Sequence, residues 1–191
     1  KNEVSGLITM KTNGLADGAA AFFQDFQLKD RELWRKFVDI YRTHPDSENY
    51  GWRGEYWGKM MRGASMVLRY TKNKELYRII KSSVLDLLSC QDEFGRISGY
   101  SKEQEFNYWD LWGRKYVMLG MMYFMEICEE QELNSRIVEA MCKHADYIID
   151  HVGPDKLDIR RCSKHWEGLN SCSILEPMVR LYRLTGEKRY F

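Results

Sequence analysis

The chain reads YTKNKEL at residues 70–76, ICEEQEL at 127–133 and LTGEKRY at 184–190. Each stretch sets a polar turn between apolar helical patterns, and corresponding positions are 57 residues apart both times. A turn that recurs at a fixed period is typical of stacked helical hairpins. A period near 57 is long for the common two-helix solenoids and favours a closed α/α toroid, whose hairpins have longer helices.

Apolar residues around these turns recur every three or four positions, as on one face of an α-helix. No segment shows sustained alternation with a period of two, so strands are at most a minor part. We therefore expect an all-α fold made of repeated helical hairpins of an (α/α)6 toroid, incomplete in this chain. The apolar pattern is clearest at residues 57–68, 76–88, 116–123, 133–148 and 174–181.

The chain of 191 residues divides near residue 50. Residues 15–26 and 31–41 have helical patterns that fit the repeat less well, and Pro45 follows the second. We expect 1–50 to form an N-terminal helical segment and 51–191 to form the first hairpins of an α/α-barrel domain. The remainder of the barrel is the expected partner of this chain.

Charge and composition exclude several classes of function. The 29 Lys and Arg residues nearly balance 28 Asp and Glu residues, so no overall field favours nucleic acid or an anionic membrane. Apolar runs are far shorter than the roughly 18–20 residues of a membrane span. No signal peptide is visible and the first residue is not Met, so cytoplasmic and exported locations both stay open.

The cysteines do not form a metal-binding pattern. Their number is odd and no CxxC pair occurs, so we expect neither a closed zinc site nor a disulfide framework, and no cofactor within this chain. Motifs that cradle phosphate or build other hydrolase centres are also absent. The five are Cys90, Cys128, Cys142, Cys162 and Cys172.

Long connections link successive hairpins at about 91–109 and 153–167, and a third segment at 49–57 precedes the first hairpin. Long ordered loops in a compact helical protein are usually functional. All three segments lead into the first helix of a hairpin. We therefore expect them to gather at one end of the stack.

The repeat makes Arg53, Asp110 and Glu167 equivalent, and we expect each to begin a hairpin. Indoles beside carboxylates and a guanidinium suit a polyhydroxylated ligand, because rings cover the C–H side of a sugar and polar groups bond its hydroxyls. Paired carboxylates also serve as acid and base in glycoside cleavage. The predicted carbohydrate site comprises Glu55, Trp57, Asp110, Trp112, Arg114, His165 and Glu167.

Structural roles for the same residues stay open. Asp110 at a helix start is a good N-cap, and Glu167 in a first turn would complement the helix dipole. Trp57 opens an apolar stripe and fits the core. Arg114 equally fits a pair with Asp110 or Glu55.

Among the histidines, His165 is the one placed for chemistry, between aromatic and acidic neighbours in a long loop. His144 and His151 are seven residues apart on one helix face, which we interpret as solvated.

Three segments carry a family resemblance: WRGEYWGK at 52–59, WDLWGRKY at 109–116 and LEPMVRLYRLTG at 175–186. Together they resemble the start of the catalytic domain of the β-L-arabinofuranosidase-like glycoside hydrolases, family 127 and its relatives. The resemblance implies an (α/α)6 barrel that acts on glycans, with a Glu acid/base and a zinc-bound Cys nucleophile from motifs later in the barrel. No Glu-Glu-x-Cys motif occurs here, so no catalytic residue is carried over and zinc is expected only in the intact family member.

We thus expect the front part of a carbohydrate-active glycoside hydrolase, with this chain alone inactive. Two alternatives stay open. One is a non-catalytic helical-repeat scaffold or glycan-binding module. The other is a different α/α-toroid sugar enzyme, such as an epimerase or a lyase.

Overall fold

The structure, a computed structural model, describes residues 13–46, 54–164 and 166–191 and confirms the all-α prediction. Within these residues, β-type pairing is limited to an isolated bridge between Val152 and Leu157, and no helix is both long and apolar enough to cross a membrane. The α-helices are α1 (Leu15–Phe23), α2 (Arg31–Thr43), α4 (Glu55–Thr71), α5 (Lys74–Leu88), α6 (Asp110–Met125), α7 (Gln131–His151) and α8 (Leu175–Thr185). Shorter helices are η1 (Gln24–Leu28), η3 (Ile159–Arg161), η4 (Ser171–Ile174) and η5 (Lys188–Tyr190).

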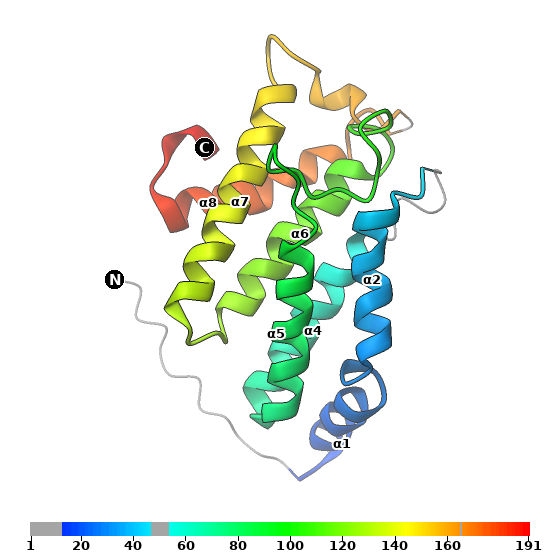
Figure 1. Ribbon diagram of the computed structural model, residues 1–191, viewed down its shortest axis with the longest axis vertical. Helices are drawn as coiled ribbons and strands as arrows, with labels where there is room; N and C mark the ends of the chain where they lie inside the picture. Colours follow the sequence, from blue (N-terminus) through cyan, green and yellow to red (C-terminus); the bar gives the residue numbers. More distant parts are fainter. Residues whose placement is uncertain (1–12, 47–53, 165) are drawn as a thin grey trace.

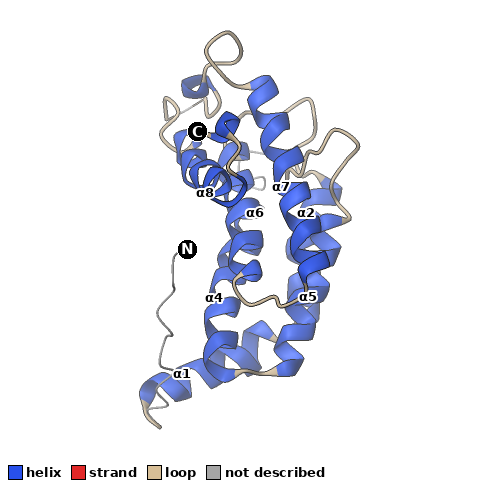
Figure 2. Cartoon of the chain, turned by 90° about the vertical axis from the view of Figure 1, so that its left-hand side faces the viewer, coloured by secondary structure: helices blue, strands red, loops and turns tan. Residues whose placement is uncertain are grey.

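The helices form two layers, which Figure 2 shows side by side. The first-helix layer contains α4, α6 and α8, and the second-helix layer contains α2, α5 and α7. Short turns lie at one end of the layers and long connections at the other, at the top of Figure 1. This is the hairpin arrangement that the repeated turns predict.

The 57-residue period holds where the second helices begin. Lys74, Gln131 and Lys188 start α5, α7 and η5, each 57 residues after the last. The residues before them have nearly the same extended backbone, with φ of −74°, −85° and −74° and ψ of 111°, 103° and 107°. The same local geometry therefore reverses the chain in all three repeats.

The N-terminal helices pack onto the hairpins. The two expected helices are present as α1 with η1 and as α2, and α2 buries Trp34, Val38 and Tyr41 in the same core as the hairpin helices. The Trp34 indole donates a hydrogen bond to the carbonyl of Leu28 at 2.8 Å, which fixes α2 on the end of η1. The division of the chain near residue 50 stays a prediction.

Two glycines let α4 and α6 approach closely. A Cβ at Gly58 would overlap the carbonyl of Tyr116, and one at Gly120 would lie 2.5 Å from the ring of Trp57 and 2.9 Å from the Cα of Gly58. The Trp57 side chain is fully buried at this contact and donates to Ser83 Oγ at 2.9 Å. Trp57 is therefore a core residue that presents no surface to a ligand in this structure.

Replacing Gly120 with Ala should destabilise the fold by roughly 1–3 kcal/mol, because the new methyl group has no space beside Trp57. Gly63→Ala in α4 is the matched control, since nothing lies within 4 Å of its added Cβ. There the better helix propensity should leave stability equal or raise it by up to about 1 kcal/mol. Urea unfolding of both variants checks this, and equal stability would contradict the close approach.

Candidate functional site

Residues 89–109 and 152–174 connect the hairpins at the same end of the layers (Figure 1). The third expected segment overlaps residues 47–53, and Arg53 therefore lies outside the described residues, as does His165. The two described connections confirm the prediction that the long segments leading into first helices share one end.

Glu167 does not begin a hairpin, so this prediction is wrong. α7 has 21 residues where α5 has 15, so the second connection starts later and α8 begins only at Leu175. Glu167 instead lies exposed in a turn with a positive φ of 45°. Its neighbour Gly168 has a φ of 84° and packs against the backbone of Arg160, where a Cβ would lie 2.6 Å from the Cα.

Asp110 begins α6 as predicted, but its carboxylate points into the protein. It accepts hydrogen bonds from Ser98 Oγ at 2.5 Å and from the backbone N–H of Phe106 at 2.8 Å. Both of its oxygens accept from Arg114 Nε, at 3.1 and 3.0 Å. Burial opposes ionisation of this fully buried carboxyl, but Arg114 and the hydrogen bonds outweigh it and hold its pKa below the usual value.

Arg114 continues this network to Glu105. Its Nη2 donates to Glu105 Oε2 at 2.8 Å, and Arg96 Nε donates to the same oxygen at 2.8 Å. The hydroxyl of Tyr147 on α7 donates to Glu105 Oε1 at 2.7 Å. The ion pairs and hydrogen bonds therefore tie the 89–109 connection to α6 and α7, and Asp110 and Arg114 anchor this connection rather than cap a helix.

His144 is fully buried, so its interpretation as solvated is wrong. Its Nδ1 accepts a hydrogen bond from the backbone N–H of Ile97 at 3.1 Å. Burial first, and the nearby charge of Arg114 second, lower its pKa to about 3. The apolar stripe of α7 contains Met141 and Ile148 on the same side, which is the signal that could have placed His144 in the core.

Glu55, which is only 8% exposed, and Trp112 meet where the first turns of α4 and α6 lie side by side, on a surface that we name the open face and that also includes Lys59, Tyr116, Lys115 and Glu176. The Trp112 indole N–H donates a hydrogen bond to Glu55 Oε2, and Lys59 Nζ donates to Glu55 Oε1 at 2.7 Å. Glu55 and Trp112 are 57 residues apart, so the same position in two repeats forms the contact.

Two lysines flank the aromatic rings of this face. Lys59 Nζ lies 5.8 Å from the centre of the Trp112 ring and 5.0 Å from that of Tyr116. Lys115 Nζ lies 4.8 and 5.3 Å from the same two rings, and 3.6 Å from Glu176 of α8. These six groups from three helices form one polar and aromatic cluster.

Further indoles extend the cluster toward the connections. Trp109 lies 5.9 Å from Trp112 with the rings at 68°, and 4.5 Å from Trp166 at 44°. Trp166 is 38% exposed and comes from the connection that also holds Glu167. Of the predicted site residues, the structure thus brings Glu55 and Trp112 together, and it places Asp110 and Arg114 beneath them in the protein interior.

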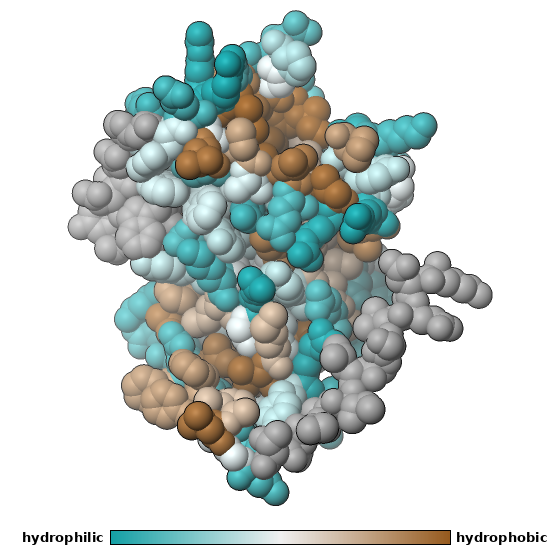
Figure 3. Space-filling view, turned by 180° about the vertical axis from the view of Figure 1, so that it is seen from behind, coloured by the Kyte–Doolittle hydropathy of each residue, from teal (hydrophilic) through white to brown (hydrophobic). Residues whose placement is uncertain are grey.

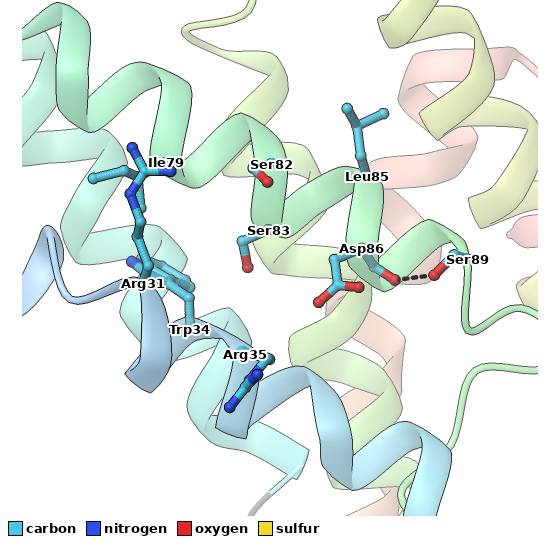
Figure 4. A pocket seen from close by; sticks show the side chains of 9 residues that line it. All are labelled: Arg31, Trp34, Arg35, Ile79, Ser82, Ser83, Leu85, Asp86 and Ser89. Carbon is cyan, nitrogen blue, oxygen red and sulfur yellow. Dashed lines mark hydrogen bonds between the residues drawn. The ribbon is translucent and has the colours of Figure 1, made fainter.

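A separate polar groove of about 510 Å³ lies on the second-helix layer, between α2 and α5 (Figure 4). Arg31 and Arg35 line it from α2, and Ser83 and Asp86 line it from α5. Asp86 already pairs with Arg42 of α2 at 2.5 Å, so this carboxylate helps to hold the two helices together.

The described residues do not fit the zinc site that the family resemblance implies. No three His, Cys, Asp or Glu side chains gather around a common point in the described part of the chain. Burial raises the pKa of the Cys162 thiol to about 12, and Asp110 adds to the shift. A cysteine that binds zinc does so as the thiolate, the form that burial disfavours at this position.

Asp110→Ala should cost about 3–5 kcal/mol of stability, because it leaves Arg114 charged and buried with only one of its two carboxylate partners. Glu32→Ala is the control: Glu32 pairs with Lys36 on an exposed helix surface, and its loss should not change stability measurably. Urea unfolding followed by circular dichroism compares the two. An Asp110 variant as stable as the control would argue against the anchoring role.

Stability should fall between pH 6.5 and 4.5 because of His144. The unfolded chain binds a proton near the ordinary histidine pKa of about 6.5, whereas the folded chain does not until about pH 3. The maximum slope for one such group is about 1.4 kcal/mol per pH unit. The lowered pKa of Asp110 acts in the same direction but only below about pH 4, whereas burial also lowers the pKa of His44, which adds to the slope in this window.

His144→Asn should flatten this slope, since an amide oxygen still accepts from Ile97 but does not titrate. His44→Asn measures the smaller share of the slope that comes from His44, whose pKa burial also lowers. The measurement is the free energy of unfolding in urea at several pH values. Identical slopes in all three proteins would overturn the assignment.

Comparison with known proteins places the chain in a family. A sequence model of the β-L-arabinofuranosidase GH127 catalytic domain matches residues 11–191. A solved structure of the GH127 β-arabinofuranosidase BT3674 is similar to this fold, with a TM-score of 0.57 and 16% sequence identity. The match covers 90% of this chain and 28% of that one, so the chain spans little more than a quarter of this relative.

No curated protein sequence matches the chain. The likeness to BT3674 shows a shared fold, in agreement with the two-layer arrangement of hairpins. The match of the catalytic-domain model covers nearly the whole chain, so the chain belongs to the GH127 β-L-arabinofuranosidase catalytic-domain family.

Proposed function

We propose that this chain provides part of the carbohydrate-binding wall of a glycoside hydrolase of the β-L-arabinofuranosidase type. Membership of the family supports the reaction class. The open face supports the location, because it is the surface of the chain where indoles, carboxylates and lysines meet at the end that carries the long connections.

The contact between Glu55 and Trp112 carries the proposal. The hydrogen bond from the indole N–H fixes the ring plane of Trp112, which stays half-buried. A fixed aromatic ring covers the apolar side of a sugar without losing much side-chain entropy on binding. The exposed Lys59, paired with the largely buried Glu55 at the edge of this ring, supplies a donor for sugar hydroxyls.

The other predicted residues have different parts in this proposal. Asp110 and Arg114 position the connection that carries Trp109, and so act through it. Glu167 is exposed in the same connection as Trp166 and stays a proposed sugar contact. No residue of the chain is assigned a role in bond cleavage.

Trp112→Ala should weaken binding of arabino-oligosaccharides by about 1–3 kcal/mol, the usual effect of removing one stacking ring. Glu55→Gln should weaken it by about 1 kcal/mol, because the amide releases both Lys59 and the indole N–H from a charged partner. Isothermal titration calorimetry with the purified chain measures both effects.

Phe22→Ala is the control, an exposed aromatic residue on α1 at the far end of the molecule. It should bind as the wild-type chain does. If Trp112→Ala binds normally while it keeps the wild-type circular dichroism spectrum, the open face is not the sugar-binding surface.

A further inference from the structure

A second cluster, built around a single aromatic ring, lies further along the open face. The ring of Tyr123 on α6 is flanked by Arg62 of α4, with its guanidinium carbon 5.4 Å from the ring centre, and by Arg180 of α8, at 5.8 Å. Cation–π contact of this kind restrains both guanidinium groups on either side of one ring. We name Arg62, Tyr123 and Arg180 the arginine clamp.

The arginine clamp is aligned with the cluster around Trp112. Trp112, Tyr116 and Tyr123 are spaced by four and seven residues, which places them on one side of α6. Eleven residues of helix rise correspond to roughly 16 Å. A ligand that touches both clusters must therefore be longer than one sugar ring.

The open face carries more positive than negative charge around these rings. Lys59, Lys115, Arg62 and Arg180 contact the rings, whereas the neighbouring carboxylates are Glu55 and Glu176. The chain as a whole carries a formal charge of only +1, so the excess is local. Figure 3 looks onto this face and shows hydrophilic side chains across its middle.

The charge around the arginine clamp is not neutralised. Arg180 pairs with Glu176 at 3.0 Å, but Lys115 uses the same carboxylate. Arg62 is exposed and pairs with no carboxylate among the described residues. Exposed arginines that an aromatic ring holds in place are preorganised for bidentate contact with a carboxylate or another oxyanion.

We propose that the open face binds an acidic oligosaccharide, whose sugar rings contact Trp112 and whose carboxylate groups are held by the arginine clamp. This inference rests on the proposed function, because it names the glycan class that the same surface takes. Charge is the discriminating feature, because a neutral glycan accepts only ordinary hydrogen bonds from Arg62 and Arg180, whereas the carboxylates of a uronate accept charge-assisted ones.

A nucleic acid is a poorer fit to the same surface. Its phosphates follow each other along the whole strand, and they would meet Glu55 and Glu176 between the cations. A glycan with a carboxylate at intervals places hydroxyls near Glu55 and charge near the clamp.

The test uses the purified full chain and two probes with the same sugar backbone, one charged and one neutral. One is an oligogalacturonide long enough to span both clusters, and the other is its fully methyl-esterified form, which has the same backbone without charge. Titration calorimetry is carried out on the wild-type chain, on the Arg62→Gln/Arg180→Gln double variant and on Arg31→Gln/Arg35→Gln. The last is the matched control, because it removes two arginines of the groove on the second-helix layer.

The wild-type chain should bind the acid at least tenfold more tightly than the ester. The clamp variant should lose about tenfold or more in affinity for the acid, the usual effect of losing charge-assisted hydrogen bonds, and keep its affinity for the ester. The control variant should bind both as the wild-type chain does. Circular dichroism of each variant verifies that it is folded.

Three outcomes would overturn the inference. The acid and the ester bind equally well, the two double variants lose the same affinity for the acid, or a single-stranded oligothymidylate competes as strongly as the acid. In each of these cases the proposed function is judged separately by the neutral arabino-oligosaccharides and Trp112→Ala. If neither neutral nor acidic glycans bind to the wild-type chain, both proposals fail together.

Discussion

The backbone contact of α4 with α6 at Gly58 and Gly120 sets the geometry of the first-helix layer. Neither position has room for a Cβ, so the two helix axes are closer than ordinary side chains would allow. The consequence appears one to two turns away, where Glu55 meets Trp112, and at the other end of the helices, where Arg69 pairs with Glu126 at 3.1 Å. Both pairs join positions 57 residues apart, so the repeat brings its own equivalent residues into contact.

Behind this layer, buried charge holds the 89–109 connection in place. Asp110, Arg114 and Glu105 are nearly inaccessible to water, and such a set is tolerated because each charge has an opposite partner and several hydrogen bonds. His144 completes this region as a neutral imidazole that receives the N–H of Ile97. The aromatic cluster on the surface therefore rests on a rigid polar interior, which suits a site that must hold rings in fixed planes.

The local sequence pattern was sufficient to predict the helices, the turns and the end of the layers that carries the connections. Apolar periodicity and turn residues act over short distances, so they are visible in the sequence. It also brought Glu55 and Trp112 into one site through the repeat. It could not distinguish a surface Asp110 from a buried one, since the partners Ser98, Phe106 and Glu105 lie in an aperiodic connection. Glu167 was misplaced because the lengths of α7 and α8 changed inside a constant period.

That constant period has a consequence for how relatives can diverge. α7 is six residues longer than α5, and α8 is five residues shorter than α6. The next second helix, η5, nevertheless begins at Lys188, 57 residues after the start of α7. Insertions and deletions are thus compensated between one short turn and the next. The connections at the other end can therefore change in length from one relative to another, and with them the surface around the aromatic cluster, while the short turns keep the helices in register.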